Sequence, residues 1–193
     1  MQILKQTWSA IAMLLLLTVL TGILYPVAVT GIAALFFPHQ SNGSLIVKHG
    51  KIQGSELLGQ QFSEPQYFWG RLSATGPFPY NSASSSGSNL GPLNPAVQSA
   101  AAARAAELRK YDPGIKEIPV DLLTSSGSGL DPHISPVAAA VQVRRVAQER
   151  SLSIEKVQEL VAKHSAARQL DILGEPRVNV LLLNRELDGL HAK

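Results

Sequence analysis

The chain has 193 residues, and 17 Lys and Arg against 14 Asp and Glu give it a formal net charge of +3. The basic residues are scattered and form no stripe interleaved with aromatic residues, which excludes nucleic acid as a partner. The chain has no cysteine, which excludes disulfides, thiolate metal sites and cysteine nucleophiles. Beyond a long apolar run near the N-terminus, about 150 residues remain, which is enough for one domain with its own core.

The apolar run covers residues 11–37, and no charged residue lies between Lys5 and Lys48. A membrane-spanning helix needs about 20 mostly apolar residues. The apolar part of a cleaved signal peptide has only about 7 to 15 residues. The length therefore favours a retained transmembrane helix over a cleaved signal, which is the alternative.

The flanks of this run predict its orientation. Lys5 lies on one side, whereas residues 38–47 on the other side carry no charge apart from a titratable His39. The positive-inside rule then predicts a short cytoplasmic N-terminus over 1–10, and export of residues 38–193. Trp8 and the pair 36–37 bracket the run as interfacial aromatic residues do, so membrane lipid is an expected neighbour.

Thr18, Gly22, Pro26 and Thr30 recur every four residues within the run. Small residues at this spacing lie on one helix face and allow another helix to approach closely. Pro26 removes a backbone donor, which predicts a local irregularity near Gly22. The pattern favours a partner-helix face, and the alternative is that membrane spans simply tolerate such residues.

The remaining sequence predicts a single mixed domain of the α+β class. Glycine between two β-branched runs predicts a hairpin over 45–53, and two further strand-like pieces are 67–69, an aromatic cluster, and 118–123. Helices are expected over 96–111 and after Pro136, because Asn94-Pro95 and Ser135-Pro136 each place a cap before a first-turn proline. Two more are expected over 154–163 and over 177–187. The helix after Pro136 is expected to point Ala140, Val143, Val146 and Ala147 inward and Gln142, Arg145 and Glu149 outward.

Two segments, 73–95 and 124–136, consist largely of Ser, Gly, Pro, Asn and Ala. Such a composition cannot form a core, and a connection as long as 73–95 is either functional or disordered. By composition alone, 73–95 is best interpreted as a mobile linker.

Catalytic and nucleotide-binding motifs are largely missing. The sequence contains no P-loop, no dinucleotide-binding glycine motif and no G-x-S-x-G elbow. Ser153 and Lys156 form an S-x-x-K pair, but its companion motifs are absent, and Ser153 fits better as a helix cap. An anchored exported hydrolase that uses Ser128, Asp131 and His133 remains the alternative function, although turn formation explains these residues more simply.

Long stretches of the chain resemble one family, the C subunit of the Kdp high-affinity potassium-transporting P-type ATPase. The resembling stretches are GILYPVAVTG at 22–31, GSELLGQQF at 54–62, YFWGRLSAT at 67–75, NSASSSGSNLGPLNP at 81–95, PVDLLTSSGSGLDPHISPVAAAVQVRRVA at 119–147 and LGEPRVNVLLLN at 173–184. They follow one another over nearly the whole chain, and only the tail after Leu190 departs.

The resemblance implies an accessory, non-catalytic subunit of an ATP-driven potassium uptake complex. Its partners would be a potassium-channel-like subunit and a P-type ATPase subunit. The family is also described as a catalytic chaperone that raises the ATP affinity of the ATPase subunit, so ATP is a possible ligand and no other cofactor is expected. An exported domain cannot reach cytoplasmic ATP, however, so we interpret the LLGQ at 57–60 as a structural turn.

The resemblance is strong in both turn-rich segments, which implies that they are ordered. Ordered loops on a rigid scaffold often carry binding function. We therefore expect the two segments to form one docking surface that faces the entrance of the potassium pathway. The candidate residues are Asn81, Ser86, Asn89, Asn94, Ser126, Ser128, Asp131 and His133.

Overall fold

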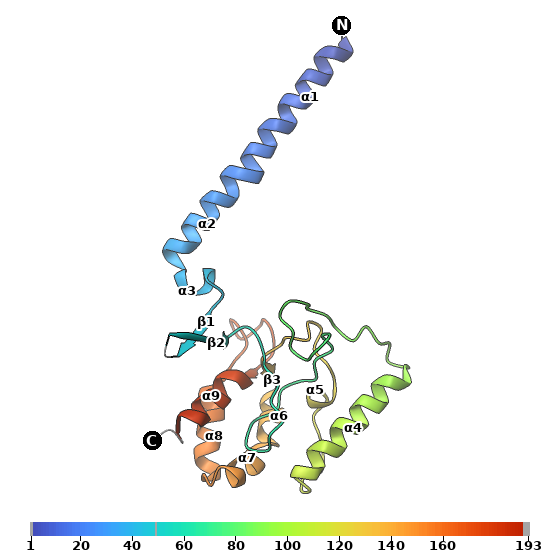
Figure 1. Cartoon of the computed structure of the whole chain (residues 1–193), viewed down its shortest axis with the longest axis vertical. Helices are drawn as coiled ribbons and strands as arrows, with labels where there is room; N and C mark the ends of the chain where they lie inside the picture. The colour runs from blue at the N-terminus through green and yellow to red at the C-terminus, as the bar shows by residue number, and fades with distance from the viewer. Residues whose placement is uncertain (1, 49, 191–193) are drawn as a thin grey trace. The chain divides into compact units, whose positions relative to one another are not determined.

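The computed structural model describes residues 2–48 and 50–190 (Figure 1). It divides into two compact units, residues 1–53 and 54–193. We call the second unit the α+β domain. The mixture of helices and short strands confirms the predicted fold class, with one long apolar helix at the N-terminus.

The first unit contains the membrane-span candidate. A helix of 35 residues, Gln2–Phe36, is long and apolar enough to cross a membrane. It consists of α1 (Gln2–Val19), a π-helical turn η1 (Leu20–Leu24) and α2 (Tyr25–Phe36). The π turn contains Gly22 and ends two residues before Pro26, where the sequence predicts an irregularity.

A short helix, α3 (Pro38–Ser41), follows the long helix. Strands β1 (Leu45–Lys48) and β2 (Lys51–Ser55) then pair in a two-stranded sheet, which confirms the hairpin predicted over 45–53.

The α+β domain contains a small antiparallel sheet and six helices among its described residues. The helices are α4 (Pro95–Tyr111), α5 (Val120–Leu123), α6 (Pro136–Ala140), α7 (Val143–Glu149), α8 (Ile154–Lys163) and α9 (Val180–Leu190). The strands are β3 (His133–Ile134), β4 (Ser165–Ala166) and β5 (Arg177–Asn179), in the order β3-β5-β4. Ile134 and Ser165 both lie opposite Val178.

Three helices begin at the caps that the sequence predicts. The side chains of Asn94, Ser135 and Ser153 accept hydrogen bonds from the backbone amides of Ala96, Ala138 and Lys156. These bonds satisfy donors that the first turn of a helix leaves open. The predicted helices at 96–111 and 154–163 are therefore confirmed.

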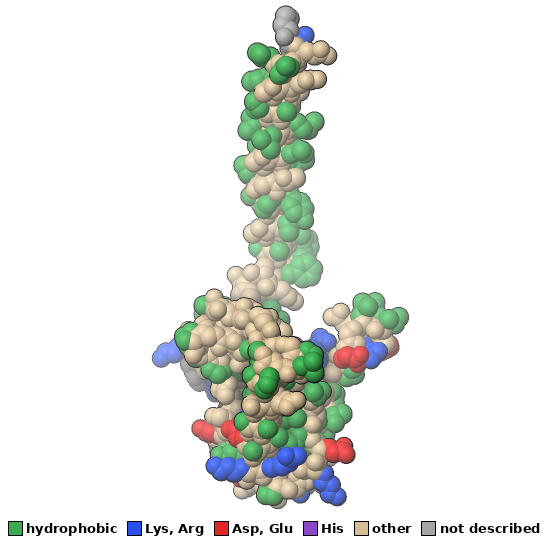
Figure 2. Space-filling model, turned by 90° about the vertical axis from the view of Figure 1, so that its right-hand side faces the viewer, with side chains coloured by type: hydrophobic (Ala, Val, Ile, Leu, Met, Phe, Trp, Pro, Cys, Tyr) green, Lys and Arg blue, Asp and Glu red, His purple; other side chains and the backbone are tan. Residues whose placement is uncertain are grey.

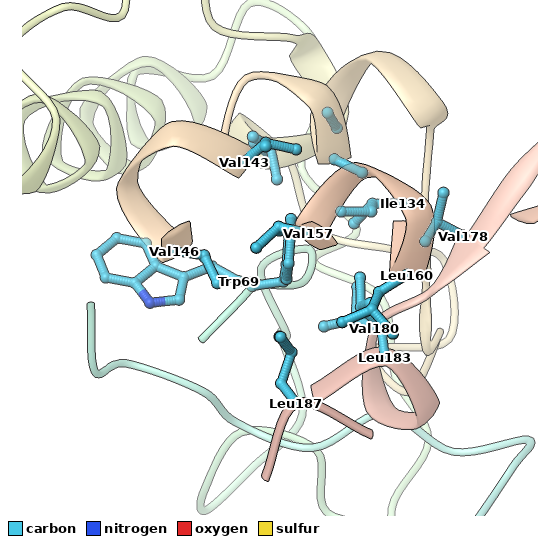
Figure 3. Packing of buried hydrophobic residues seen from close by; sticks show 14 of the residues in the cluster. Trp69, Ile134, Val143, Val146, Val157, Leu160, Val178, Val180, Leu183 and Leu187 are labelled. Atoms are coloured by element: carbon cyan, nitrogen blue, oxygen red, sulfur yellow. The ribbon is translucent and has the colours of Figure 1, made fainter. Parts of the chain in front are cut away.

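The core joins α6, α7, α8 and α9 to the small sheet (Figure 3). Val157 and Leu160 of α8 are buried against residues of α9 and β5. Trp69 lies at one side of the cluster, close to Val146 of α7.

Several predicted elements of the domain are wrong. Within 118–123, residues 120–123 form the short helix α5 instead of a strand, and 67–69 form no strand. The helix after Pro136 is interrupted between α6 and α7, and the last helix begins at Val180, because Arg177–Asn179 pair as β5.

The predicted faces of the helix after Pro136 are also partly wrong. Ala140 is exposed, whereas Gln142 and Arg145, which we expected at the surface, are buried. The remaining expectations for this segment, with Val143, Val146 and Ala147 inside and Glu149 outside, are confirmed.

Two amide side chains explain why 67–69 is buried without being a strand. Gln142 bonds the backbone N–H of Trp69 at 2.8 Å and its carbonyl oxygen at 3.1 Å. Asn184 of α9 bonds the N–H and the carbonyl oxygen of Phe68, each at 2.9 Å. Since buried backbone groups need partners, these amides replace the neighbouring strand that a sheet would supply.

Buried guanidinium groups surround the same segment. The Cζ atoms of Arg104 and Arg145 lie 4.6 and 4.8 Å from the ring centroid of Trp69. Arg145 also donates to the carbonyl oxygens of Pro65 and Tyr67. Burial lowers the pKa of Arg145 to about 10, so its guanidinium stays charged at neutral pH.

Candidate docking surface

The two turn-rich segments are hydrogen-bonded to each other. The N–H of Ser86 and the hydroxyl of Ser85 both donate to the carbonyl oxygen of Ser128, at 3.0 Å each. The hydroxyl of Ser73 donates to the carbonyl oxygen of Gly129 at 2.7 Å. Contacts across more than 40 residues of sequence therefore join 73–95 to 124–136, and the interpretation of 73–95 as a linker is wrong.

Hydroxyl groups hold the first segment together from inside. Ser73 Oγ accepts from the N–H of Tyr80 at 2.9 Å, and Thr75 Oγ1 accepts from the N–H of Asn81 at 3.0 Å. Thr75 Oγ1 in turn donates to the carbonyl oxygen of Phe78 at 2.8 Å. These bonds satisfy loop backbone groups, as short polar side chains do in turns.

Tyr80 connects this segment to the rest of the domain. Its hydroxyl donates to the carbonyl oxygen of Arg71 at 2.7 Å, and its ring lies against Gly59 and Gly70. A Cβ at Gly59 would lie 2.4 Å from the Tyr80 ring. Burial raises the pKa of the Tyr80 hydroxyl to about 12, so it remains a proton donor at physiological pH.

The second segment is held by its own short bonds. The N–H of Leu130 donates to Ser128 Oγ at 3.1 Å, and the N–H of Ser126 donates to the carbonyl oxygen of Leu72 at 3.2 Å. Leu72 and Ser125 also form an isolated parallel bridge. The second segment therefore lies against residues 72–75, where the first turn-rich segment begins.

Asp131 and His133 form a local pair at the end of the second segment. Asp131 Oδ1 lies 3.0 Å from both the backbone N and the ring Nδ1 of His133, and Oδ2 lies 3.7 Å from the Arg71 guanidinium. Burial alone would raise the pKa of Asp131, but the bonds from His133 and the charge of Arg71 lower it below the usual value. The carboxylate is therefore ionised at neutral pH.

Among the hollows that adjoin the segments, two have more than 500 Å³. A cleft of about 610 Å³ is lined by Arg71, Pro119, Val120, Asp121, Asp131, His133, Ile134, Ser135, Glu175, Pro176 and Arg177. A more apolar groove of about 520 Å³ is lined by Leu72, Ser73, Ala74, Ser88, Leu90, Pro92, Val97, Ala100, Leu123, Thr124 and Ser125. The cleft thus has charged residues in its lining, whereas the groove has none.

The structure brings together most of the predicted docking residues. Asn81, Ser86, Ser128, Asp131 and His133 lie in the joined segments, exposed or half-buried. Ser126 is only 4% exposed and supports the surface from beneath. Asn94 is the cap of α4, and Asn89 adopts a left-handed backbone on the exposed stretch that leads to α4.

Ser73, Thr75 and Tyr80 are missed by the sequence reasoning. Their importance lies in bonds between residues that local patterns do not connect. Tyr80 is one of the few large side chains of the segment, which is a signal that could have pointed to it, but nothing in the sequence distinguishes Ser73 and Thr75 from the other serines of the segment.

The three residues of the alternative hydrolase hypothesis, Ser128, Asp131 and His133, do not form one hydrogen-bonded chain within the described residues. Ser128 Oγ accepts a backbone N–H, and no hydrogen bond joins it to His133 anywhere in the part of the chain that the structure describes. Residues 2–48 and 50–190 also hold no group of three or more His, Asp or Glu that could bind a metal. The surface consists instead of backbone amides, carbonyls and small polar side chains.

The anchor face predicted at Thr18, Gly22, Pro26 and Thr30 is exposed along its length. Figure 2 shows hydrophobic side chains along the whole length of the face of this helix that is turned to the viewer. Gly22 has only the Thr18 methyl within 4.0 Å of a built Cβ, so the groove at this position is open. A role for this face in packing stays a prediction.

Comparison with known proteins identifies the family. The family model for KdpC, the c chain of the K⁺-transporting ATPase, matches residues 7–189. A potassium-transporting ATPase KdpC subunit of Herpetosiphon aurantiacus is 59% identical over 182 residues, which cover 94% of each chain. The corresponding subunits of Methylococcus capsulatus and Ralstonia nicotianae are 58% and 59% identical, over 94% of this chain and 96% and 90% of theirs. The chain therefore belongs to the KdpC family and is a component of a potassium uptake complex.

Proposed function

We propose that this chain is an accessory, non-catalytic subunit that docks on the exported side of the complex through its two turn-rich segments. The main support is the hydrogen bonding of 73–95 to 124–136, which makes two stretches of turns into one ordered surface. Such a surface offers many preset donors and acceptors to a partner without folding on binding, which lowers the entropic cost of association.

The partner for this surface is the potassium-channel-like subunit, next to the entrance of its ion pathway. The P-type ATPase subunit is the second partner, and it hydrolyses ATP. Direct potassium binding by this chain is not part of the proposal, because Asp131 is the one acidic residue of the two segments and is already bonded to His133.

Replacement of Asn81–Ser88 by a Gly/Ser stretch of equal length tests this role. The change removes the Asn81 side-chain bonds to Gly76 and Ala83 and the Ser85 bond to Ser128. We expect weaker co-purification with the channel-like subunit and loss of growth at low external potassium, with the domain still folded. Normal growth would mean that this stretch is passive.

The same co-purification assay tests the anchor. Gly22→Leu fills the open position on the small-residue face and should weaken association. Leu24→Phe, at a 57% exposed position two residues further on and about half a helical turn away, should not. Equal effects of the two substitutions would argue against a defined face.

The orientation of the chain is part of the proposal. Lys5 precedes the span and an uncharged segment follows it, so the N-terminus lies in the cytoplasm and the domain is exported. A reporter that is active only in the cytoplasm, fused after Lys193, is expected to be inactive. A fully active reporter would place the domain beside cytoplasmic ATP and overturn the docking role.

Help with ATP use is then indirect, through the packing of subunits. The residues of LLGQ support this reading, because Gly59 donates its N–H to the carbonyl oxygen of Leu130 at 2.8 Å and is covered by the Tyr80 ring. Leu57 donates to Ser55 Oγ at 3.2 Å. The backbone of this motif is thus engaged within the domain.

A further inference from the structure

A short hairpin projects between α8 and β5, over residues 165–177. After β4 pairs with β5, Gln169 and Leu173 exchange two backbone hydrogen bonds of 2.9 Å each. Arg168 donates to both carboxylate oxygens of Glu175, at 2.7 and 2.6 Å. The hairpin is therefore an ordered element, although it lies outside the core.

The turn at the end of this hairpin has an unusual backbone for its residues. Leu170 and Asp171 have φ angles of 53° and 57°. Left-handed backbone is common for glycine and tolerated by Asp, but it is rare for leucine. The turn therefore holds local backbone strain at Leu170.

The tip carries three large apolar side chains that the domain leaves in solvent. Leu170, Ile172 and Leu173 are 85%, 76% and 58% exposed. Single exposed apolar residues are ordinary, but three within four residues at the end of an ordered hairpin are typical of an interaction site. The chain belongs to a multisubunit complex, so another subunit is available to bury them.

The charge at the centre of the tip indicates whether lipid or another protein covers these apolar side chains. Asp171 lies between Leu170 and Ile172 and makes no ion pair with any residue in 2–48 or 50–190. Burying a carboxylate in lipid is costly, whereas a protein pocket can supply a Lys or Arg at its rim. The chemistry therefore favours a protein.

We propose that the hairpin tip at 170–173 inserts into an apolar pocket, rimmed by Lys or Arg, on the channel-like subunit. Glu175 and Arg177 at the base of the hairpin line the same cleft as Asp131 and His133. The tip thus extends the docking surface to a second point of contact. The choice of this subunit rests on the proposed function.

Cross-linking in membranes that contain the whole complex tests the contact. Because the chain has no cysteine, Leu170→Cys introduces its only thiol, which can carry a thiol-reactive photo-cross-linker. We expect a cross-linked product with the channel-like subunit. Val137→Cys, at a 64% exposed position on α6, is the matched control and should give none. Cross-links to lipid alone, to a second copy of this chain, or to nothing would overturn the proposal.

Substitution measures what the contact contributes. Leu170→Asn and Ile172→Asn each remove one buried apolar side chain from the contact. Each should lower the affinity of this subunit for the rest of the complex by about tenfold or more, and the double variant should be retained least on the purified complex. Val137→Asn should not lower the affinity. Asp171→Lys should also weaken retention, since the pocket rim is basic.

These results separate the hairpin from the turn-rich segments. A cross-link from Leu170→Cys together with a harmless replacement of Asn81–Ser88 would retain the hairpin contact and refute the proposed role of the segments. The reverse pattern would refute the hairpin contact alone.

Discussion

Replacing Gly129 by alanine is expected to separate the two turn-rich segments and to abolish potassium uptake at low external concentration. Gly129 has a φ of 68°, and a Cβ there would lie 2.6 Å from the carbonyl oxygen of Ser86 and 2.6 Å from the Thr75 methyl. The left-handed backbone costs a non-glycine residue about 1–2 kcal/mol. The steric overlap adds about 1–3 kcal/mol unless the segments move apart.

Movement of the segments would break the bonds that define the surface. Ser86 must retreat from its 3.0 Å bond to Ser128, and Ser73 from its 2.7 Å bond to the carbonyl oxygen of Gly129 itself. Uptake by whole cells at low potassium and co-purification of the subunits measure the result. The circular dichroism of the purified chain should change little, because the helices lie elsewhere.

Gly127→Ala is the matched control. Gly127 is two residues away in the same SGSG stretch, and a built Cβ meets nothing within 4 Å. Gly127 also does not have the positive φ that Gly129 has. We expect normal uptake from this variant. If Gly129→Ala also supported normal uptake, the joined segments would not be the docking surface.

Truncating Trp69 to alanine is expected to have the largest effect on stability. The side chain is fully buried, stacks edge-on against Tyr111 with a centroid distance of 5.6 Å, and donates from Nε1 to the carbonyl oxygen of Glu64 at 2.9 Å. Removal of a buried tryptophan typically costs about 3–5 kcal/mol. A domain is stable by only about 5–15 kcal/mol, so this loss is a large part of the total.

Urea unfolding of the detergent-solubilised chain, followed by far-UV circular dichroism, measures the loss. The midpoint should fall strongly for Trp69→Ala and less for Trp69→Phe, which keeps an aromatic ring beside Arg104 and Arg145. An unchanged midpoint for Trp69→Ala would show that the ring and its two guanidinium neighbours contribute little. Trp8→Ala in the membrane-span candidate is the control and should leave the domain transition unchanged.

The sequence predicted correctly those elements that depend on interactions between residues close together in the chain. Asn94-Pro95 and Ser135-Pro136 begin helices because a cap and a first-turn proline act within a few residues. The long apolar run predicted a helix because a single segment in lipid can satisfy its backbone hydrogen bonds only as a helix. Both kinds of signal are complete within one stretch of chain.

Elements that depend on distant partners were not predictable in this way. The mostly apolar segment 118–123 contains the short helix α5, and Asp121 there accepts the N–H of Ser135 at 2.7 Å. Gln142 and Arg145 have polar side chains, which indicates an exposed face, but their partners lie in 65–69. The order within 73–95 likewise depends on 124–136, which composition alone does not reveal.

The pairing of Phe68 with Asn184 has a consequence for the folding of the nascent chain. These residues are 116 positions apart, and Arg150 on α7's C-terminal side is likewise bonded to Asp188 of α9 at 2.7 Å. The middle of the domain therefore cannot close until its last helix has been synthesised. A nascent chain would therefore leave the Phe68–Trp69 segment unprotected until then.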